Sequence, residues 1–346
     1  MKKERQFGLD LIRALAISMV FLIHMLAICK VLSNELQSPK WVIYDFSHFL
    51  SMIAVPLFLL LTGYLQARKK LNSRHYISGL PTILSYFLTS GVAAALMVYA
   101  FGMPKGGLAR LILHIFDFTY GYAWYMEMYI CLFMLIPFLN ILFEALNHKQ
   151  QIWMIGILAL LTLLPSVVSN FIVTGIWCEV MPDFLENMYV ITYYFIGAYI
   201  CKYRPAPSRI WCAVVALVVL VGETLISFVL SSKEYAWYVS NSFSSLAHAV
   251  VAVSIFLLLY QVQFNFKPLR WLVGEIATCS FEMYLLSYFT DSYLYKIIPL
   301  SPWQILMINF VVTYIGARLL RCAVAPLGNL LKKGVLHLSE NRKSVL

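Results

Sequence analysis

Apolar segments long enough to cross a bilayer recur along this chain, and they constrain its fold more than any other feature. A transmembrane helix needs about 20 apolar residues, and about ten such segments can be placed. They span residues 7–31, 46–66, 80–101, 122–146, 151–171, 188–203, 210–231, 243–264, 272–296 and 302–326. Only 12% of the residues are charged, well below the about 25% of soluble domains. The sequence therefore predicts an all-α integral membrane protein: one polytopic domain over residues 1–346, a bundle of about ten transmembrane helices.

Lysine and arginine are unevenly distributed between the connecting segments. With a cytoplasmic N-terminus, the inner segments and ends carry 19 of the 26 Lys and Arg residues, the outer ones carry 6, and Arg13 lies within a helix. Such an excess is typical of the cytoplasmic side. We expect both termini in the cytoplasm, a basic tail over residues 327–346, and a multi-pass location in a bacterial plasma membrane. The bases do not gather in one groove, so the net charge of +10 indicates no nucleic-acid partner.

The remaining composition adds no redox or metal chemistry. The seven cysteines lie mostly in apolar segments and lack the spacing of metal ligands or redox pairs. We therefore expect no metal site and no bound cofactor. The apolar run after MKKERQ is of membrane-spanning length and is followed by no small-residue cleavage site, so we interpret it as a retained helix.

Three ionisable residues share one face of the first apolar segment. Arg13 and His24 lie 11 positions apart, which at about 100° per residue places them on the same side of a helix, about 16 Å apart along its axis. Asp10 lies one turn before Arg13. A charge in a bilayer costs at least about 2.5 kcal/mol, so this stripe indicates a functional interior. The alternative is that Asp10 and Arg13 form an interfacial pair and His24 only contacts a neighbouring helix.

Other polar groups fall inside predicted helices. Glu127, Glu223 and Glu282 are candidates for function, although each could instead be neutral or paired for structure alone. Trp124 and Tyr125 lie near a helix end, where an aromatic belt would explain them equally well.

The densest basic cluster follows the second segment. It comprises Arg68, Lys69, Lys70 and Arg74. Positive-inside signalling explains it, and the same side chains could hold the phosphates of a cytoplasmic donor.

These residues together resemble the membrane acyltransferase-3 family. The Arg-x10-His pattern is joined by PLFLLLTGY at residues 56–64, by Arg74 with Pro81, by Trp124-Tyr125 with Pro137, and by Ser280 with Tyr284-Leu-Leu. The resemblance extends from residue 7 to about residue 326. A narrower similarity is to the membrane portion of the vancomycin-resistance serine racemases.

The resemblance implies an O-acyltransferase that uses acyl-CoA as co-substrate. It implies transfer of an acyl group, usually acetyl, from cytoplasmic acyl-CoA to a hydroxyl of an extracytoplasmic acceptor such as a surface polysaccharide or a peptidoglycan-type glycan. His24 is the best-placed base for the hydroxyl, and Arg13 supplies fixed positive charge. The supporting intramembrane polar residues would be Asp10, Trp124, Tyr125, Glu127, Glu282, Tyr284 and Ser287.

One departure from the family leaves a second function open. Many relatives have a histidine shortly after the Tyr-Leu-Leu element, where this chain has Ser287; His248, in the segment 243–264, is an imidazole that could compensate. The stripe of ionisable residues would also suit a proton-coupled carrier of a small polar solute or an amino acid such as serine.

Overall fold

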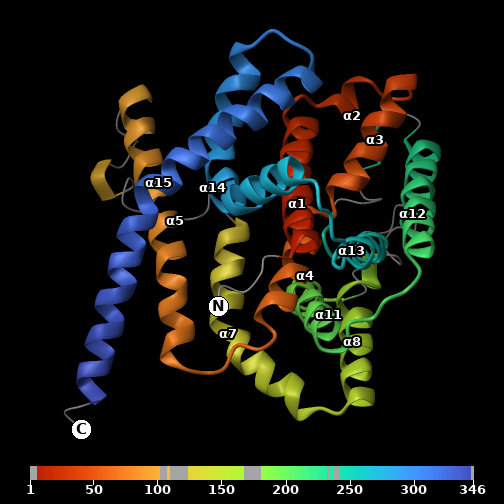
Figure 1. Cartoon of the computed structure of the whole chain (residues 1–346). Coiled ribbons are helices and arrows are strands. Elements are labelled where there is room, and N and C mark those ends of the chain that lie inside the picture. The colour runs from red at the N-terminus through yellow and green to blue at the C-terminus, as the bar shows by residue number, and fades with distance from the viewer. Residues whose placement is uncertain are drawn as a thin grey trace.

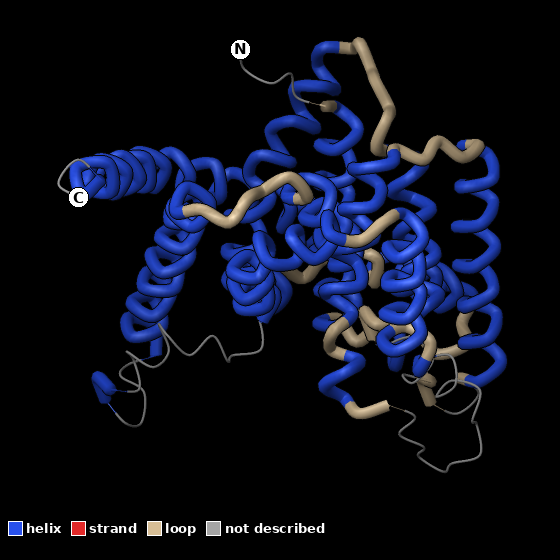
Figure 2. The backbone as a smooth tube through the Cα atoms, turned by 90° about the horizontal axis from the view of Figure 1, so that it is seen from below, coloured by secondary structure: helices blue, strands red, loops and turns tan. Residues whose placement is uncertain are grey.

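The computed structural model describes residues 6–101, 107–109, 124–166, 181–231, 234–236 and 242–343. Within those ranges every regular element is a helix (Figures 1 and 2). The helices are α1 (Phe7–Ile28), α2 (Val31–Asn34), α3 (Pro39–Ser51), α4 (Ala54–Gln66), α5 (Ser73–Phe101), α7 (Trp124–Ala145), α8 (His148–Thr162), α10 (Asp183–Glu186), α11 (Tyr189–Tyr203), α12 (Arg209–Leu230), α13 (Leu246–Leu259), α14 (Lys267–Ile297) and α15 (Pro302–Lys343).

Each of the ten predicted segments coincides with a helix or, for residues 46–66, with the pair α3 and α4. Residues 122–123 and 167–171 of two predicted segments lie outside the described residues. By length and composition, five helical stretches among the described residues could cross a membrane: Phe7–Ile28, Pro39–Gln66, Trp124–Ala145, Arg209–Leu230 and Pro302–Val335. The all-helical membrane class is therefore confirmed, while ten crossings and the orientation stay predictions.

The predicted tail continues the last helix. α15 runs from Pro302 to Lys343 without a break, so residues 327–343 are helical. In Figure 1, α15 and α5 occupy one edge of the molecule, α12 and α8 the opposite edge, and α1 lies between them. α1 packs against α3, α4 and α14, which makes it the centre of the bundle.

Helix α4 crosses α11 at the closest packing in the bundle. A Cβ atom on Gly63 would lie 2.1 Å from the Tyr194 carbonyl oxygen, and one on Gly197 would lie 2.2 Å from the Leu60 carbonyl oxygen. Only glycine fits at either position, because any side chain would collide with the backbone of the other helix. Small residues of this kind let membrane helices approach closely without a hydrophobic driving force.

The second membrane segment is divided into α3 and α4. Ser38 caps α3, since its Oγ accepts a hydrogen bond from the Trp41 amide at 3.2 Å and Pro39 takes the first helical position. Pro56 has no amide hydrogen to donate to the carbonyl four residues earlier, which interrupts the helical ladder at residues 52–53. Both halves of the divided segment pack against α1.

Helix α12 has its apolar side chains outward and its polar side chains inward. Ile210 is 76% exposed and Val229 is 73% exposed, whereas Glu223 and Ser227 are buried against neighbouring helices. This is the reverse of a soluble helix and is what a helix at the lipid-facing edge of a membrane bundle requires.

Candidate functional site

A cavity of about 1500 Å³ opens along α1 and is bounded also by α4, α7, α14 and α15. Nine of the residues predicted for the site line it: Asp10, Arg13, His24, Arg68, Lys69, Trp124, Tyr125, Glu282 and Tyr284. The predicted polar stripe of α1 therefore faces a space large enough for a substrate.

His24 is paired with a carboxylate from α14. Its Nδ1 lies 2.8 Å from Oδ2 of Asp291. The His24 side chain is 23% exposed, toward the cavity, and Asp291 is only 1% exposed. With Nδ1 donating to the carboxylate, Nε2 carries the ring's lone pair and is the basic nitrogen. This is the arrangement of a general base oriented by a buried acid.

Asp291 is itself held by α15. Nδ2 of Asn309 donates to Oδ1 of Asp291 at 2.5 Å, and the Thr313 hydroxyl donates to the side-chain Oδ1 of Asn309 at 3.2 Å. Thr290 completes the chain, with its hydroxyl 2.6 Å from that of Thr313. Asp291, Asn309 and Thr313 are at most 1% exposed. Such a satisfied buried network fixes the carboxylate, and through it the imidazole, in one position.

Arg13 lines the same cavity nearer the N-terminus of α1, where it is half-buried. Tyr125 and Tyr129 of α7 line the cavity as well. The ring of Tyr125 also contacts that of Tyr284 from α14, with centroids 5.7 Å apart. Arg13 therefore shares the cavity with phenol groups from two helices, and its guanidinium can pair there with a negative group of a ligand.

Two bases of the predicted loop reach the cavity. Arg68 and Lys69 follow α4, and both are exposed and line the cavity. Asn140 of α7 holds this loop, since its Nδ2 donates to the carbonyl oxygens of Gln66 at 2.9 Å and Lys69 at 2.8 Å. Tyr194 of α11 donates to the Asn140 side-chain oxygen at 2.7 Å. A buried amide thus fixes the backbone that presents the two cations.

Two further cationic side chains line the cavity, and neither was predicted from the sequence. Arg204, at the end of α11, and Arg321, on α15, line the cavity together with Arg68 and Lys69. Arg321 donates to Oε1 of Glu282 at 3.0 Å and to the Thr278 carbonyl oxygen at 2.7 Å. The predicted functional candidate Glu282 is therefore half of an ion pair at the cavity wall.

The remaining predicted residues lie elsewhere. Lys70, Arg74, Glu127 and Ser287, all within the described part of the chain, are not among the residues that line the cavity. The Ser287 hydroxyl is buried and donates to the Tyr284 carbonyl oxygen at 2.7 Å. Lys70 and Arg74 are exposed beyond the cavity mouth. Glu223 lies outside the cavity, with Oε1 3.6 Å from His248 Nε2.

Asp291 was not predicted as a site residue, although the sequence contains a signal that could have identified it. It lies inside the predicted segment 272–296, so the test that singled out Glu282 applies equally to it. Among the described residues, no group of three or more His, Cys, Asp or Glu side chains is arranged to hold a metal ion.

The fold and the cavity define an integral membrane protein with a cavity, lined partly by polar side chains, inside its helical bundle. A family model described as an acyltransferase domain matches residues 6–322, nearly the whole chain. The chain therefore belongs to the membrane acyltransferase-3 family, and it is an enzyme that transfers acyl groups other than aminoacyl groups. No curated protein and no solved structure shows significant similarity to it.

Proposed function

We propose that this enzyme transfers an acetyl group from cytoplasmic acetyl-CoA to a hydroxyl of an extracytoplasmic glycan, in the plasma membrane of a bacterium. The pairing of His24 with Asp291 inside the cavity carries the proposal. Acyl transfer to a hydroxyl needs a base that removes the proton as the oxygen attacks.

The proposed reaction uses His24 twice. Nε2 takes the proton of the acceptor hydroxyl while its oxygen bonds to the acyl carbonyl carbon of the thioester. The carbonyl oxygen becomes negative in the tetrahedral intermediate. Arg13 lies about 16 Å from His24 along α1, so its guanidinium is proposed to bind the donor's phosphates together with Arg68 and Lys69. The carbon–sulfur bond then breaks, the CoA sulfur receives the proton from the His24 imidazolium, and the products are the acyl ester and free CoA.

The donor is proposed to enter at the end of the cavity that carries Arg68, Lys69 and Arg204. Guanidinium and ammonium groups are the natural partners of phosphate oxygens. His24 lies near the opposite end of α1 from Asp10 and Arg13, about 16 Å along the helix from Arg13. One cavity lined by both groups supports a path from donor to acceptor without a second site. The orientation with both termini cytoplasmic follows from the lysine and arginine distribution.

The test is acetyl transfer by the purified protein in proteoliposomes. Radiolabelled acetyl-CoA is supplied with peptidoglycan fragments or surface polysaccharide, and both label transfer and CoA release are measured. We expect both to be lost in His24→Ala and in Arg13→Ala, with normal membrane insertion of each variant. His148→Ala is the matched control, since His148 lies at the start of α8 and does not line the cavity. Turnover that survives both cavity substitutions would overturn the mechanism.

A further inference from the structure

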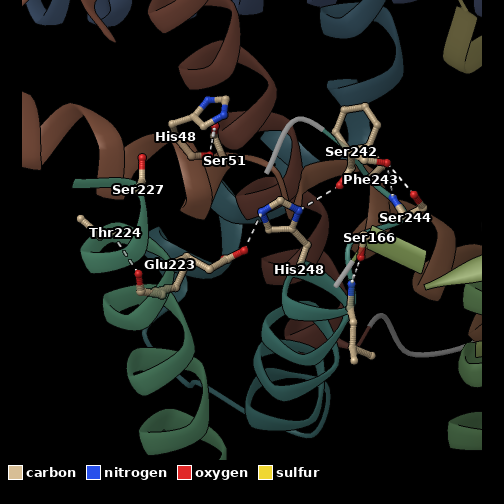
Figure 3. Close-up of polar contacts among 12 residues, drawn as sticks. His48, Ser51, Ser166, Glu223, Thr224, Ser227, Ser242, Phe243, Ser244 and His248 are labelled. Atoms are coloured by element: carbon tan, nitrogen blue, oxygen red, sulfur yellow. Dashed lines mark hydrogen bonds and ion pairs between the residues drawn. The ribbon is translucent and has the colours of Figure 1, made fainter. Parts of the chain in front are cut away.

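A second group of buried polar side chains lies outside the cavity, between α3, α12 and α13. We call Asp45, His48, Glu223, Ser227 and His248 the His248 cluster (Figure 3 shows four of the five). Each is at most 7% exposed, and none lines the cavity. Burying so many polar groups in a membrane bundle is costly, so the cluster calls for a reason.

His248 connects this cluster to the chain segment before α13. Its Nδ1 lies 3.0 Å from the Ser242 carbonyl oxygen, and its Nε2 lies 3.6 Å from Oε1 of Glu223 (Figure 3). A carbonyl oxygen only accepts hydrogen bonds, so Nδ1 carries the hydrogen and donates. Glu223 lies beyond the other edge of the ring, at a distance too long for a hydrogen bond. The imidazole of α13 therefore holds the backbone at residue 242 and packs beside α12.

The segment from Ser242 to Leu246 is also held by two side chains from elsewhere in the bundle and by a hydrogen bond within the segment. The Tyr193 hydroxyl of α11 donates to the Phe243 carbonyl oxygen at 3.0 Å. The Leu246 amide donates to the Ser166 Oγ at 3.2 Å (Figure 3). Within the segment, the Ser244 amide donates to the Ser242 Oγ at 3.1 Å. Side chains thus supply the partners that a helix would otherwise provide.

This anchored segment presents Phe243 to the cavity. The ring of Phe243 stacks on that of Trp124, with centroids 5.4 Å apart and planes at 23°. Both residues line the cavity that holds His24. We call these two residues the aromatic wall. Its position depends on the backbone at residues 242 and 243, because that backbone carries Phe243.

We infer that His248, through its hydrogen bond to the Ser242 carbonyl oxygen, is a positioning residue that holds the aromatic wall in place for the ring of a glycan acceptor. The acceptor part rests on the proposed function; the positioning part does not. A flat apolar surface suits the C–H face of a sugar ring, whose hydroxyls then point sideways toward a base. The burial of His248 is explained in this way, since it fixes the residues that lead into α13.

The positioning part is tested by fluorine NMR of protein labelled with 5-fluorotryptophan. The chain has 8 tryptophans, and Trp124→Phe assigns the resonance of Trp124. Phe243→Ala removes the stacked ring and so gives the change in the Trp124 chemical shift that a displaced aromatic wall would cause. We expect His248→Leu to shift the Trp124 resonance in the same direction. His248→Asn should leave it in place, because the asparagine amide occupies the position of Nδ1 and still donates to Ser242.

The other resonances report whether a variant has kept its fold. If His248→Leu shifts the resonances of all the tryptophans, the variant has lost its fold. Two other variants then test the position of the same segment: Glu223→Gln, beside His248, and Ser166→Ala, which removes the partner of the Leu246 amide. An unmoved Trp124 resonance in folded His248→Leu, or an equal shift in His248→Asn, would overturn the positioning role.

The acceptor part is tested by steady-state kinetics with a soluble N-acetylglucosamine oligomer and with peptidoglycan fragments. We expect His248→Leu and Phe243→Ala to raise the acceptor KM by about tenfold, with kcat and the acetyl-CoA KM nearly unchanged and with recovery in His248→Asn. A loss confined to kcat or to the donor KM would overturn the acceptor role. If the unmodified enzyme acetylates neither probe, the proposed function and the acceptor role both fail, while the NMR result still decides the positioning role.

Discussion

Two histidine–carboxylate pairs lie in the described part of the bundle, and they differ in access. His24 and Asp291 are 2.8 Å apart, and the His24 side chain is 23% exposed toward a large cavity. His248 and Glu223 are 3.6 Å apart, and the His248 side chain is fully buried. A base acts only on a proton that can reach it, so the first pair is suited to chemistry and the second to holding structure. The residue types alone do not separate these uses; the surrounding space does.

The largest effect on activity is expected from replacing His24, the histidine that faces the cavity. His24→Ala should lower kcat by at least about a thousandfold, because the general base and the proton donor to CoA are lost together. Single-turnover assays with labelled acetyl-CoA measure this directly. A variant that retains more than a tenth of the activity would contradict the assignment, and His248→Ala should not reproduce the loss.

A smaller but still large effect is expected at Asp291. Asp291→Asn should lower kcat by about a hundredfold with little change in either KM, because the amide no longer favours the tautomer with the basic lone pair on Nε2. Asn309→Leu, which removes the support of Asp291, should have a weaker effect of the same kind. Unchanged kcat in Asp291→Asn would show that the carboxylate only packs against His24.

The bases at the cavity mouth should act on donor binding alone. Replacing both Arg68 and Lys69 by alanine should raise the acetyl-CoA KM by about tenfold without lowering kcat, because charge-assisted bonds to phosphate are lost. The matched control replaces Lys70 and Arg74, which are exposed but do not line the cavity. An equal rise in that control would mean that the loop acts through its total charge.

The buried pair, His248 with Glu223, should matter for stability and little for kcat. His248→Leu removes the Nδ1–H donation to the Ser242 carbonyl oxygen, which then accepts only from the Ser245 amide, at a cost of about 0.5–1.5 kcal/mol. Thermal unfolding in detergent should therefore show a lower Tm for His248→Leu than for the unmodified enzyme, while kcat stays nearly unchanged. An unchanged Tm, or a loss of kcat as large as in His24→Ala, would break the distinction between the two pairs.

The local features of the site could be predicted from sequence, and the pairings could not. The common face of Arg13 and His24 follows from helical periodicity within one segment. His24 and Asp291 are 267 positions apart, and their contact depends on how α1 packs against α14. Arg204 enters the cavity for the same reason, since α11 must first cross α4 at Gly63. Lys70 and Arg74 look equivalent to Arg68 and Lys69 in sequence, and only the direction of the loop separates them.

The central claim is that His24 acts as the base inside the cavity, and chemical rescue tests it most directly. Imidazole added to His24→Gly in proteoliposomes should restore acetyl-CoA turnover in a concentration-dependent manner, because the cavity of about 1500 Å³ can admit the missing ring. Imidazole should not stimulate Arg13→Ala. Full activity of His24→Gly without imidazole, or equal stimulation of both variants, would contradict the account.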